Sequence, residues 1–328
     1  MTGIKDLKIN LEQRILGAEK VVIVPHKRID FDAIGSGIGL SLIAQKLRKP
    51  SVIVVDEDIP KEERGLKLIF EDAKKDFNII NRDRYLQMQS GGDLYLLTDV
   101  NKSYLISLRE LLTKDRTVII DHHDEDKDTV DADLKFINTT ASSASEIVSK
   151  LLCLFKIKPT PEIAKYLLAG IYLDTNKLTK NASADTMKVV AKLLESGANL
   201  NRVTDLFMQD FVSDRRVQDL INKAKILEYK IALVCAEEGI QYTPEDLAKA
   251  SDYLLNYGVD ASFAIGNIGS GLISISARSK ERIHVGEVMK SLGGGGNQYS
   301  AAAKLTDTTI EEVGKQLMKT MQVPYYIG

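Results

Sequence analysis

The stretch VVIVPHKRIDFDAIGS at residues 21–36 decides the fold, because an apolar run ends in polar residues just before a helical stretch. A short, continuous apolar run is typical of a parallel strand that is buried on both faces. The helical stretch at 33–47 is followed by a second apolar run, SVIVV, at 51–55. This order of strand, helix and strand predicts a mostly parallel, doubly wound α/β sheet.

The same rhythm continues to about residue 180. The apolar run LYLLT at 94–98 precedes Asp99, and the run RTVII at 116–120 precedes the next polar group. Between these two runs we expect a helix around 105–112. In open α/β sheets, ligand sites form outside the carboxyl ends of the strands. The polar residues that follow the apolar runs are therefore expected to meet at one edge of the sheet.

The second half of the chain has a different pattern. Residues 186–226 look helical throughout and are interpreted as a connector between domains. We therefore expect a first domain at 1–185 and a smaller α/β domain at 227–328. In the second domain, strands are expected in YKIALVCAEE and DASFAIGNIGSGLISISARS, the latter holding two strands joined by a turn at 267–270. A closing helix is expected at 310–321.

The composition is ordinary for a globular chain of 328 residues, 44% hydrophobic and 27% charged. A net charge of −2 argues against a general coat for duplex nucleic acid, which needs a large basic excess. Cys153 and Cys235 lie in apolar stretches without CxxC spacing, which predicts reduced core thiols in a cytoplasmic protein. No apolar run reaches the ~18 to 20 residues of a membrane span, and the start MTGIKDLKIN lacks the apolar region of a signal peptide.

Carboxylates and imidazoles concentrate at the predicted strand ends and at the end of one apolar helix. Three of the four histidines of the chain belong to this group. So much negative charge in one cleft would be repulsive unless cations neutralised it. Mixed histidine and carboxylate ligands suit a divalent ion such as manganese, and their number suffices for two ions. The candidate residues are His26, Asp30, Asp32, Asp99, Asp121, His122, His123 and Asp174.

Each of these residues also has a purely structural alternative. Asp30 and Asp32 can cap the helix that follows them, and Asp99 can cap the segment after it. Asp174 is unremarkable by itself, but a buried carboxylate at a helix end needs a partner. The two adjacent histidines after a buried strand point in different directions, so one can bind metal while the other faces a substrate. The fourth histidine, His284, lies outside the motifs and is interpreted as a surface residue.

A glycine cluster and one arginine of the second domain are candidate phosphate contacts. Gly293 to Gly296 form a backbone that can approach a phosphate closely and offer several N–H donors. Arginine suits bidentate phosphate binding, and Arg278 with Ser279 ends the expected strand GLISISARS. A flexible turn is the alternative for the glycines, and a surface salt bridge is the alternative for the arginine.

Taken in order, these motifs resemble those of the DHH/DHHA1 phosphoesterase superfamily over residues 15–322. The first motif is matched by His26, Asp30 and Asp32, the second by Asp99, the third by Asp121-His122-His123 and the fourth by Asp174. Within the superfamily, the chain is most similar to the cytosolic catalytic part of GdpP-type cyclic-di-AMP phosphodiesterases. That similarity rests on HKRIDFDAIGS, with a bulky residue between the aspartates, on DASFAI and ISISARS, and on the four successive glycines.

The resemblance implies two metal sites that share one carboxylate, that of Asp99. Manganese is the expected metal, with two ions per chain and with cobalt or magnesium as substitutes. Two such ions activate a water molecule and stabilise the leaving oxygen. By resemblance, one ion would be held by His26, Asp30 and Asp99, and the other by Asp32, Asp99, His122 and Asp174.

The resemblance also assigns roles to residues that hold no metal. His123 would contact the scissile phosphate and stabilise the charge of the transition state. Asp121 would orient a histidine. In the second domain, the substrate would meet Arg278, Ser279, Gly294, Gly295, Gly296 and Asn297.

The implied reaction is hydrolysis of cyclic-di-AMP to the linear dinucleotide pApA. The enzyme would be cytoplasmic, or the cytosolic part of a membrane-anchored protein. A nanoRNase or pAp phosphatase that acts on short oligoribonucleotides is the alternative, and a degenerate nucleotide sensor is a third, which the intact metal motifs disfavour. The expected partner is a small nucleotide rather than duplex nucleic acid, and a homodimer is compatible with the resemblance.

Two features depart from the family pattern. Asn297 stands where the family has a histidine after the glycines, and asparagine can donate a hydrogen bond but cannot be cationic. The membrane helices, the PAS-like region and the degenerate GGDEF domain of typical GdpP proteins do not occur in this sequence. A stand-alone form and an excised catalytic part both remain open.

Overall fold

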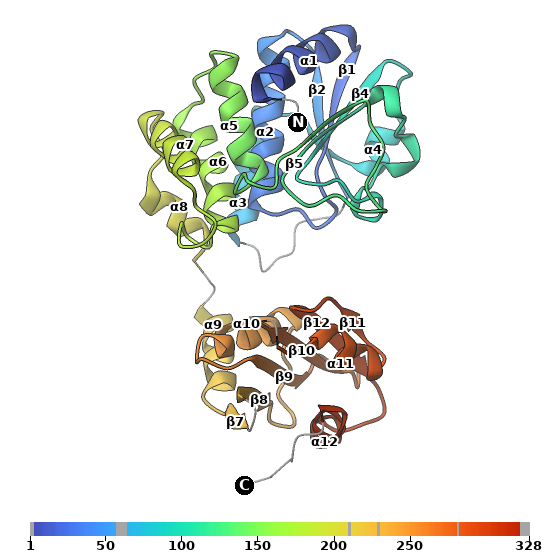
Figure 1. The fold of residues 1–328 in the computed structure, drawn as a ribbon, viewed down its shortest axis with the longest axis vertical. Coiled ribbons are helices and arrows are strands. Elements are labelled where there is room, and N and C mark those ends of the chain that lie inside the picture. Colours follow the sequence, from blue (N-terminus) through green and yellow to red (C-terminus); the bar gives the residue numbers. More distant parts are fainter. Residues whose placement is uncertain (1–2, 57–63, 209–210, 228–229, 281, 322–328) are drawn as a thin grey trace. The chain divides into compact units, whose positions relative to one another are not determined.

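Two compact units, residues 1–208 and 209–328, make up the chain (Figure 1). Each unit has its own sheet and its own hydrophobic core. The computed structural model describes residues 3–56, 64–208, 211–227, 230–280 and 282–321.

The first unit is built on a six-stranded sheet in the order β3-β2-β1-β4-β5-β6, in which every neighbouring pair is parallel. This confirms the predicted doubly wound sheet. The strand order reverses between β1 and β4, and such a reversal opens a crevice for ligands outside the carboxyl ends of the strands. The strands are β1 (Lys20–Val24), β2 (Ser51–Val55), β3 (Ile79–Asn81), β4 (Asp93–Thr98), β5 (Thr117–Asp121) and β6 (Leu134–Ile137).

Helices cover both faces of this sheet, with α2, α5 and α6 on one side and α4 on the other (Figure 1). Successive side chains of a strand point to opposite faces. In β1, accordingly, Ile23 belongs to the larger core and Val22 to the smaller one. The helices are α1 (Ile4–Gly17), α2 (Phe31–Lys46), α3 (Arg64–Ala73), α4 (Arg82–Leu86), α5 (Ala144–Leu154), α6 (Pro161–Asp174), α7 (Ala184–Glu195) and α8 (Leu200–Leu206).

The prediction of a helix around 105–112 is wrong. Two short 3-10 turns, Ser103–Leu105 and Arg109–Leu111, stand there instead. The backbone between them pairs with the loop after β1, since Lys27 N–H donates to the Leu105 carbonyl at 2.9 Å and His26 forms a bridge with Ile106. Tertiary pairing has thus overridden the local apolar pattern, and the segment lies against the loop that carries His26.

The second unit has a six-stranded sheet in the order β11-β12-β10-β9-β8-β7, with β8 and β9 parallel and the other pairs antiparallel. The expected strands, the turn at 267–270 and the closing helix are confirmed. The strands are β7 (Lys225–Leu227), β8 (Ile231–Cys235), β9 (Ala261–Asn267), β10 (Ile273–Ser279), β11 (Gly295–Gly296) and β12 (Ser300–Leu305), and the helices are α9 (Phe211–Ile221), α10 (Pro244–Leu255), α11 (Val285–Ser291) and α12 (Ile310–Met321).

The helical residues expected as a connector are divided between the two units. In the first unit, α7 and α8 contact α6, and in the second unit α9 contacts α10. The domain limits 1–185, 186–226 and 227–328 stay a prediction.

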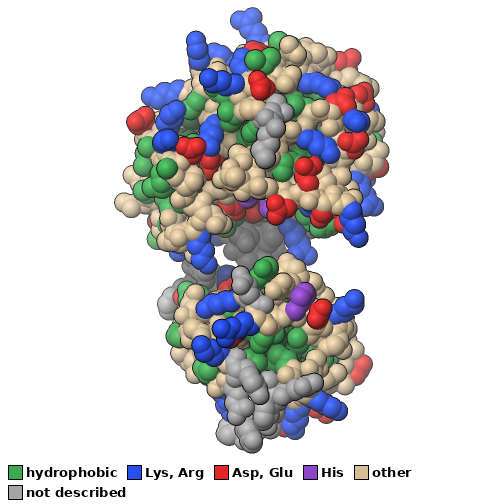
Figure 2. Space-filling view, in the orientation of Figure 1, with side chains coloured by type: hydrophobic (Ala, Val, Ile, Leu, Met, Phe, Trp, Pro, Cys, Tyr) green, Lys and Arg blue, Asp and Glu red, His purple; other side chains and the backbone are tan. Residues whose placement is uncertain are grey.

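Three properties of the surface bear on the sequence analysis. Cys153 is exposed and Cys235 is half-buried, so the expectation of two core thiols is wrong for Cys153, which lies on the outer face near the end of α5. Lysine, arginine and acidic side chains are mixed over the face seen in Figure 2, which has no continuous basic surface. In the part of the chain that the structure describes, no helix combines the length and the apolar character that crossing a membrane requires.

Candidate functional site

The predicted metal ligands come together at the carboxyl end of the parallel sheet. His26 follows β1, Asp99 follows β4 and the run Asp121-His122-His123 ends β5. Helix α2 supplies Asp30 and Asp32 at its start, and α6 supplies Asp174 at its end. Within each of three groups, the ligand atoms all lie within 4.8 Å of one another: His26 with Asp30 and Asp99; Asp32 with Asp99, His122 and Asp174; and Asp99 with Asp121, His122 and His123.

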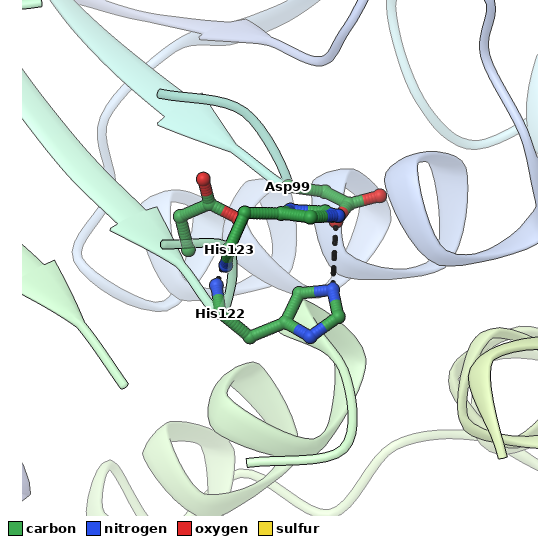
Figure 3. Close-up of side chains that lie close together, drawn as sticks. Asp99, His122 and His123 are labelled. Atoms are coloured by element: carbon green, nitrogen blue, oxygen red, sulfur yellow. Dashed lines mark hydrogen bonds and ion pairs between the residues drawn. The ribbon is translucent and has the colours of Figure 1, made fainter. Parts of the chain in front are cut away.

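Asp99 is the centre of this cluster. Its Oδ2 lies 3.4 Å from His26 Nε2. Its Oδ1 lies 3.3 Å from His122 Nε2, and Figure 3 draws this second pair. The backbone of Asp99 is left-handed, with φ of 57°, a conformation that Asp adopts more readily than most residues. Its N–H donates to the Ile120 carbonyl at 3.2 Å, so the pairing with β5 continues one residue beyond β4 and fixes the backbone of Asp99. One carboxylate therefore faces two different histidines.

The two adjacent histidines both lie near Asp99 Oδ1, at 3.3 Å for His122 and 3.7 Å for His123, but each has a different second partner. His122 Nε2 also lies 3.3 Å from Asp174 Oδ2, whereas His123 Nδ1 lies 2.9 Å from Asp121 Oδ1. The same Asp121 oxygen accepts the N–H of His122 at 2.7 Å, and this fixes the loop. The His123 side chain is 56% exposed, so its ring can meet a molecule from outside, while that of His122 is turned inward.

Asp30 performs the capping role and also belongs to the cluster. Its Oδ1 accepts the N–H groups of Asp32 and Ala33 at 2.9 and 3.0 Å. Its Oδ2 lies 3.5 Å from His26 Nε2. The structural and functional interpretations of Asp30 are therefore compatible, because each uses a different oxygen.

Asp32 is fully buried and is held by the start of α5. Its Oδ2 accepts the Ala144 N–H at 2.7 Å, and its Oδ1 accepts the Ser145 N–H at 2.8 Å. The amino end of a helix favours negative charge. On the other side, a Cβ at Gly170 would lie 2.6 Å from Asp32 Oδ1 and 2.4 Å from Ser145 Oγ, so only glycine fits there.

Two groups that hold the cluster in place by hydrogen bonds were not predicted from the sequence. One is the start of α5, whose helix cap Ser143 in the stretch SSASE was the available signal. The other is Asn101, a buried residue whose Nδ2 donates to the His123 carbonyl at 3.0 Å. Its signal was its place two residues after Asp99, in the same loop.

The ionisation of the cluster follows from burial and mutual charge. Burial alone would lower the histidine pKa values. The close negative charges of the neighbouring carboxylates outweigh it and raise the pKa of His26 to about 10 and that of His122 to about 11. For Asp99, burial raises the pKa, but the two histidines hold it at about 2. Burial raises the pKa of Asp32 well above its usual range, with the negative charges of Asp99 and Asp174 adding to the effect.

The cluster fits a divalent metal ion. Asp99 Oδ1 and His122 Nε2 are both buried without a hydrogen-bond partner, although they face each other. Burying polar atoms without partners is costly, and a cation would be a partner for both. Imidazole nitrogen and carboxylate oxygen together suit ions such as manganese or zinc.

Two family models match the chain: the DHH family, N-terminal domain, over residues 20–171, and the DHHA1 domain over residues 228–322. The chain belongs to the DHH/DHHA1 family. It is 32% identical, over 97% of its length, to the cyclic-di-AMP phosphodiesterase GdpP of Geobacillus thermodenitrificans. It is 30% identical, also over 97% of its length, to the cyclic-di-AMP phosphodiesterase PdeA of Listeria monocytogenes. The chain spans 49% of each of these relatives, about half of their length.

The fold is shared with a solved exopolyphosphatase-related protein from Bacteroides fragilis. The TM-score is 0.80, and the match covers 96% of this chain and 95% of that one at 22% identity. The agreement therefore extends over both the DHH unit and the DHHA1 unit.

In the DHHA1 unit, the predicted substrate residues already have partners. Arg278 Nε donates to Asp252 Oδ1 at 2.8 Å, so the surface salt bridge considered for it does form. The Ser279 hydroxyl donates to the Asp260 carbonyl at 3.2 Å. Asn297 Oδ1 accepts the N–H groups of Tyr299 and Ser300 at 2.9 and 2.8 Å. Among the described residues, no hydrogen bond from Asn297 Nδ2 is formed.

The glycine cluster forms a tight hairpin rather than an unstructured turn. Gly295 and Gly296 pair with β12, and Gly296 has φ of 141°, which favours glycine. A Cβ at Gly294 would lie 2.1 Å from the Ala302 carbonyl oxygen, so packing also requires glycine there. At Gly295 a Cβ would meet nothing within 4 Å, so this position has room for a ligand. His284 is exposed, as expected, and its Nδ1 accepts the Glu287 N–H at the start of α11.

We expect the free energy of unfolding of the metal-free protein to fall as the pH rises. The pKa values of His26 and His122 lie above the usual 6.5, so their stabilising contribution is complete below that pH and is lost through about 10 to 11. The raised pKa values of Asp32 and Asp174 act in the same direction. Urea unfolding in EDTA, at about pH 6.5 and about pH 9.5, measures this difference. A flat profile, or an equal slope in His122→Gln, would contradict it.

Gly170→Ala is expected to weaken metal binding without unfolding the first unit. The added Cβ would push Asp32 and Ser145 out of position. Loss of such a supporting contact typically lowers metal affinity about 10- to 100-fold. Gly37→Ala is the matched control, because a Cβ there would meet Ile23 at an ordinary 3.6 Å. Manganese titration followed by EPR compares the two variants, and equal affinities would contradict the prediction.

Proposed function

We propose that this chain is a two-metal phosphodiesterase that hydrolyses cyclic-di-AMP to pApA with two manganese ions. The observation that carries the proposal is the place of Asp99, whose two oxygens face His26 and His122 separately. A carboxylate in this position can bridge two ions. The similarity to GdpP and PdeA, both cyclic-di-AMP phosphodiesterases, supports the choice of substrate.

The two ions would share Asp99 and use the remaining side chains as separate ligand sets. His26 and Asp30 would complete one set, and Asp32, His122 and Asp174 the other. Bound manganese lowers the pKa of a water molecule and polarises a phosphoryl oxygen. The α5 amides and Asp174 hold Asp32 and His122 in place for the second set.

His123 would act on the substrate rather than on a metal. Asp121 accepts a hydrogen bond from Nδ1 and raises the pKa of the His123 ring, which favours the imidazolium. Nε2 of that ring then carries a proton and can donate to a non-bridging phosphate oxygen. A donor fixed in advance stabilises the charge that develops in the transition state.

A second candidate function is hydrolysis of short oligoribonucleotides or pAp. It is favoured by Asn297, because the side-chain oxygen of this residue accepts two backbone N–H groups of the adjacent turn. A loop without a cationic ring attracts a phosphate less strongly. Nucleotide sensing without turnover is disfavoured, because the whole cluster of acidic and imidazole groups is present.

The proposal is tested by comparing cyclic-di-AMP, pApA, short RNA and pAp as substrates in manganese, with product analysis by chromatography. We expect cyclic-di-AMP to be cleaved to pApA, and excess EDTA to abolish the reaction. Faster cleavage of short RNA or pAp would favour the second candidate. Binding of a nucleotide without any cleavage would overturn both.

Asp99→Ala is expected to reduce kcat more than about a hundredfold, because displacing reacting groups by about 1 Å already costs that much. Both ion sets lose a ligand in this variant, so the manganese content is expected to fall as well. Asp124→Ala is the control, since Asp124 directly follows His123 but lies outside the cluster and is exposed. Mass spectrometry of bound metal and steady-state kinetics give the two readouts. Near-normal kcat and metal content in Asp99→Ala would contradict the bridging role.

Two substitutions at Asn297 test whether the glycine hairpin meets a phosphate. Asn297→Asp retains the oxygen that accepts the two backbone N–H groups but adds negative charge, so we expect weaker dinucleotide binding at an unchanged Tm. Asn297→His supplies a ring that can donate a charge-assisted bond, roughly twice as strong as a neutral one, and is expected to bind more tightly. Titration with pApA measures both. Equal affinity of Asn297→Asp and the wild type would remove Asn297 from the substrate site.

A further inference from the structure

An apolar cavity lies between α1, α5 and α7 in the first unit, and its volume is about 220 Å³. It is separate from the acidic cluster. Helix α5 holds Asp32 with its first residues, Ala144 and Ser145, whereas its later residues 149–154 line the cavity. From Ser145 to Cys153 the helix axis rises about 12 Å. A ligand in the cavity would therefore not touch the proposed metal ligands.

The walls of the cavity are mostly aliphatic. Leu152 of α5 and Val189 and Leu193 of α7 are almost fully buried and face it, and Ile4 of α1 forms part of another wall. Its lining contains no aspartate or glutamate. Cys153, which is exposed, lies at the opening.

Lysines surround this apolar cavity. Lys150 Nζ forms an ion pair with Glu146 Oε1 at 2.5 Å. Lys192 Nζ lies 3.9 Å from Cys153 Sγ. Among the residues that the structure describes, no carboxylate forms an ion pair with Lys192 or with Lys5, the third lysine of the lining. The cavity therefore combines apolar walls with positive charge that has no acidic partner.

We propose that this cavity binds a small apolar carboxylate, whose tail lies among Leu152, Val189 and Leu193 and whose head pairs with Lys192. An apolar tail is favoured because it displaces water from aliphatic walls. A cavity of about 150 Å³ with aliphatic and aromatic walls is known to hold benzene. This larger one fits a chain of about eight carbons. A carboxylate head is favoured because lysines line the cavity and its lining contains no acidic side chain that would repel a carboxylate.

Octanoate is the probe, and octan-1-ol is its uncharged counterpart. The thiol of Cys153 reports occupancy, because a ligand seated in the cavity covers the opening. The rate of alkylation by N-ethylmaleimide is measured at Cys153 and, as an internal reference, at Cys235 in the second unit, by mass spectrometry of peptides. Octanoate at about ten times its dissociation constant is expected to slow alkylation of Cys153 about tenfold and to leave Cys235 unchanged.

Matched variants locate the head and the tail of the ligand. Lys192→Gln is expected to weaken octanoate about tenfold, the usual value of one charge-assisted bond. Lys188→Gln is its control, because Lys188 lies one turn earlier on α7, pairs with Asp185 and does not line the cavity. Val189→Phe is expected to fill the cavity and abolish binding of octanoate, as calorimetry would show.

Three outcomes would overturn the proposal. The first is no protection of Cys153 by millimolar octanoate. The second is equal protection by octan-1-ol, which would remove the carboxylate from the proposal. The third is equal affinity in Lys192→Gln and Lys188→Gln. None of these readouts depends on catalysis, so the result is independent of the phosphodiesterase assignment.

Discussion

Repulsion among buried carboxylates at the carboxyl end of the parallel sheet is the constraint on which the first unit depends. The negative charge of Asp99 adds to burial in raising the pKa values of Asp32 and Asp174. Without a metal, the compensation comes from the imidazoles of His26 and His122 and from the amides of α5. A divalent ion would neutralise the carboxylates with two positive charges on a single atom. It would also be a partner for the buried atoms that have no hydrogen bond. The same groups thus stabilise the fold and prepare it for a metal.

The position of the cluster is a consequence of strand order. The strand order reverses between β1 and β4, and in open α/β sheets such a point is where ligands bind, outside the carboxyl ends of the strands. His26 and Asp99 lie at the two sides of that point. The segment after β4 is hydrogen-bonded to the loop of His26, through Lys27 N–H to the Leu105 carbonyl and the bridge between His26 and Ile106.

Local patterns in the sequence were enough to predict the four strands of the first sheet that lead to the cluster, but not β3 and β6 at its edges. Apolar runs identify β1, β2, β4 and β5, and the polar residues directly after them identify the cluster. What the sequence did not reveal depends on contacts between distant segments. Asp32 and Ser145, which are hydrogen-bonded, are separated by 113 positions. The segment 103–111 does not form the expected helix, because its Leu105 carbonyl pairs with the N–H of Lys27. Such pairings have no local signature, because each residue type involved is common in ordinary loops and caps.

Asn297 shows how a departure from a family pattern can have a structural cause. Its side-chain oxygen accepts two backbone N–H groups and so closes the hairpin that follows the glycines. A histidine ring offers one acceptor nitrogen, as His284 does at the start of α11, and would leave one of those groups without its partner. The asparagine therefore favours a well-closed turn, whereas a histidine would favour the attraction of an anion. Since the residues of the acidic cluster match the family motifs throughout, differences in substrate preference are more readily expected from this hairpin than from the metal ligands.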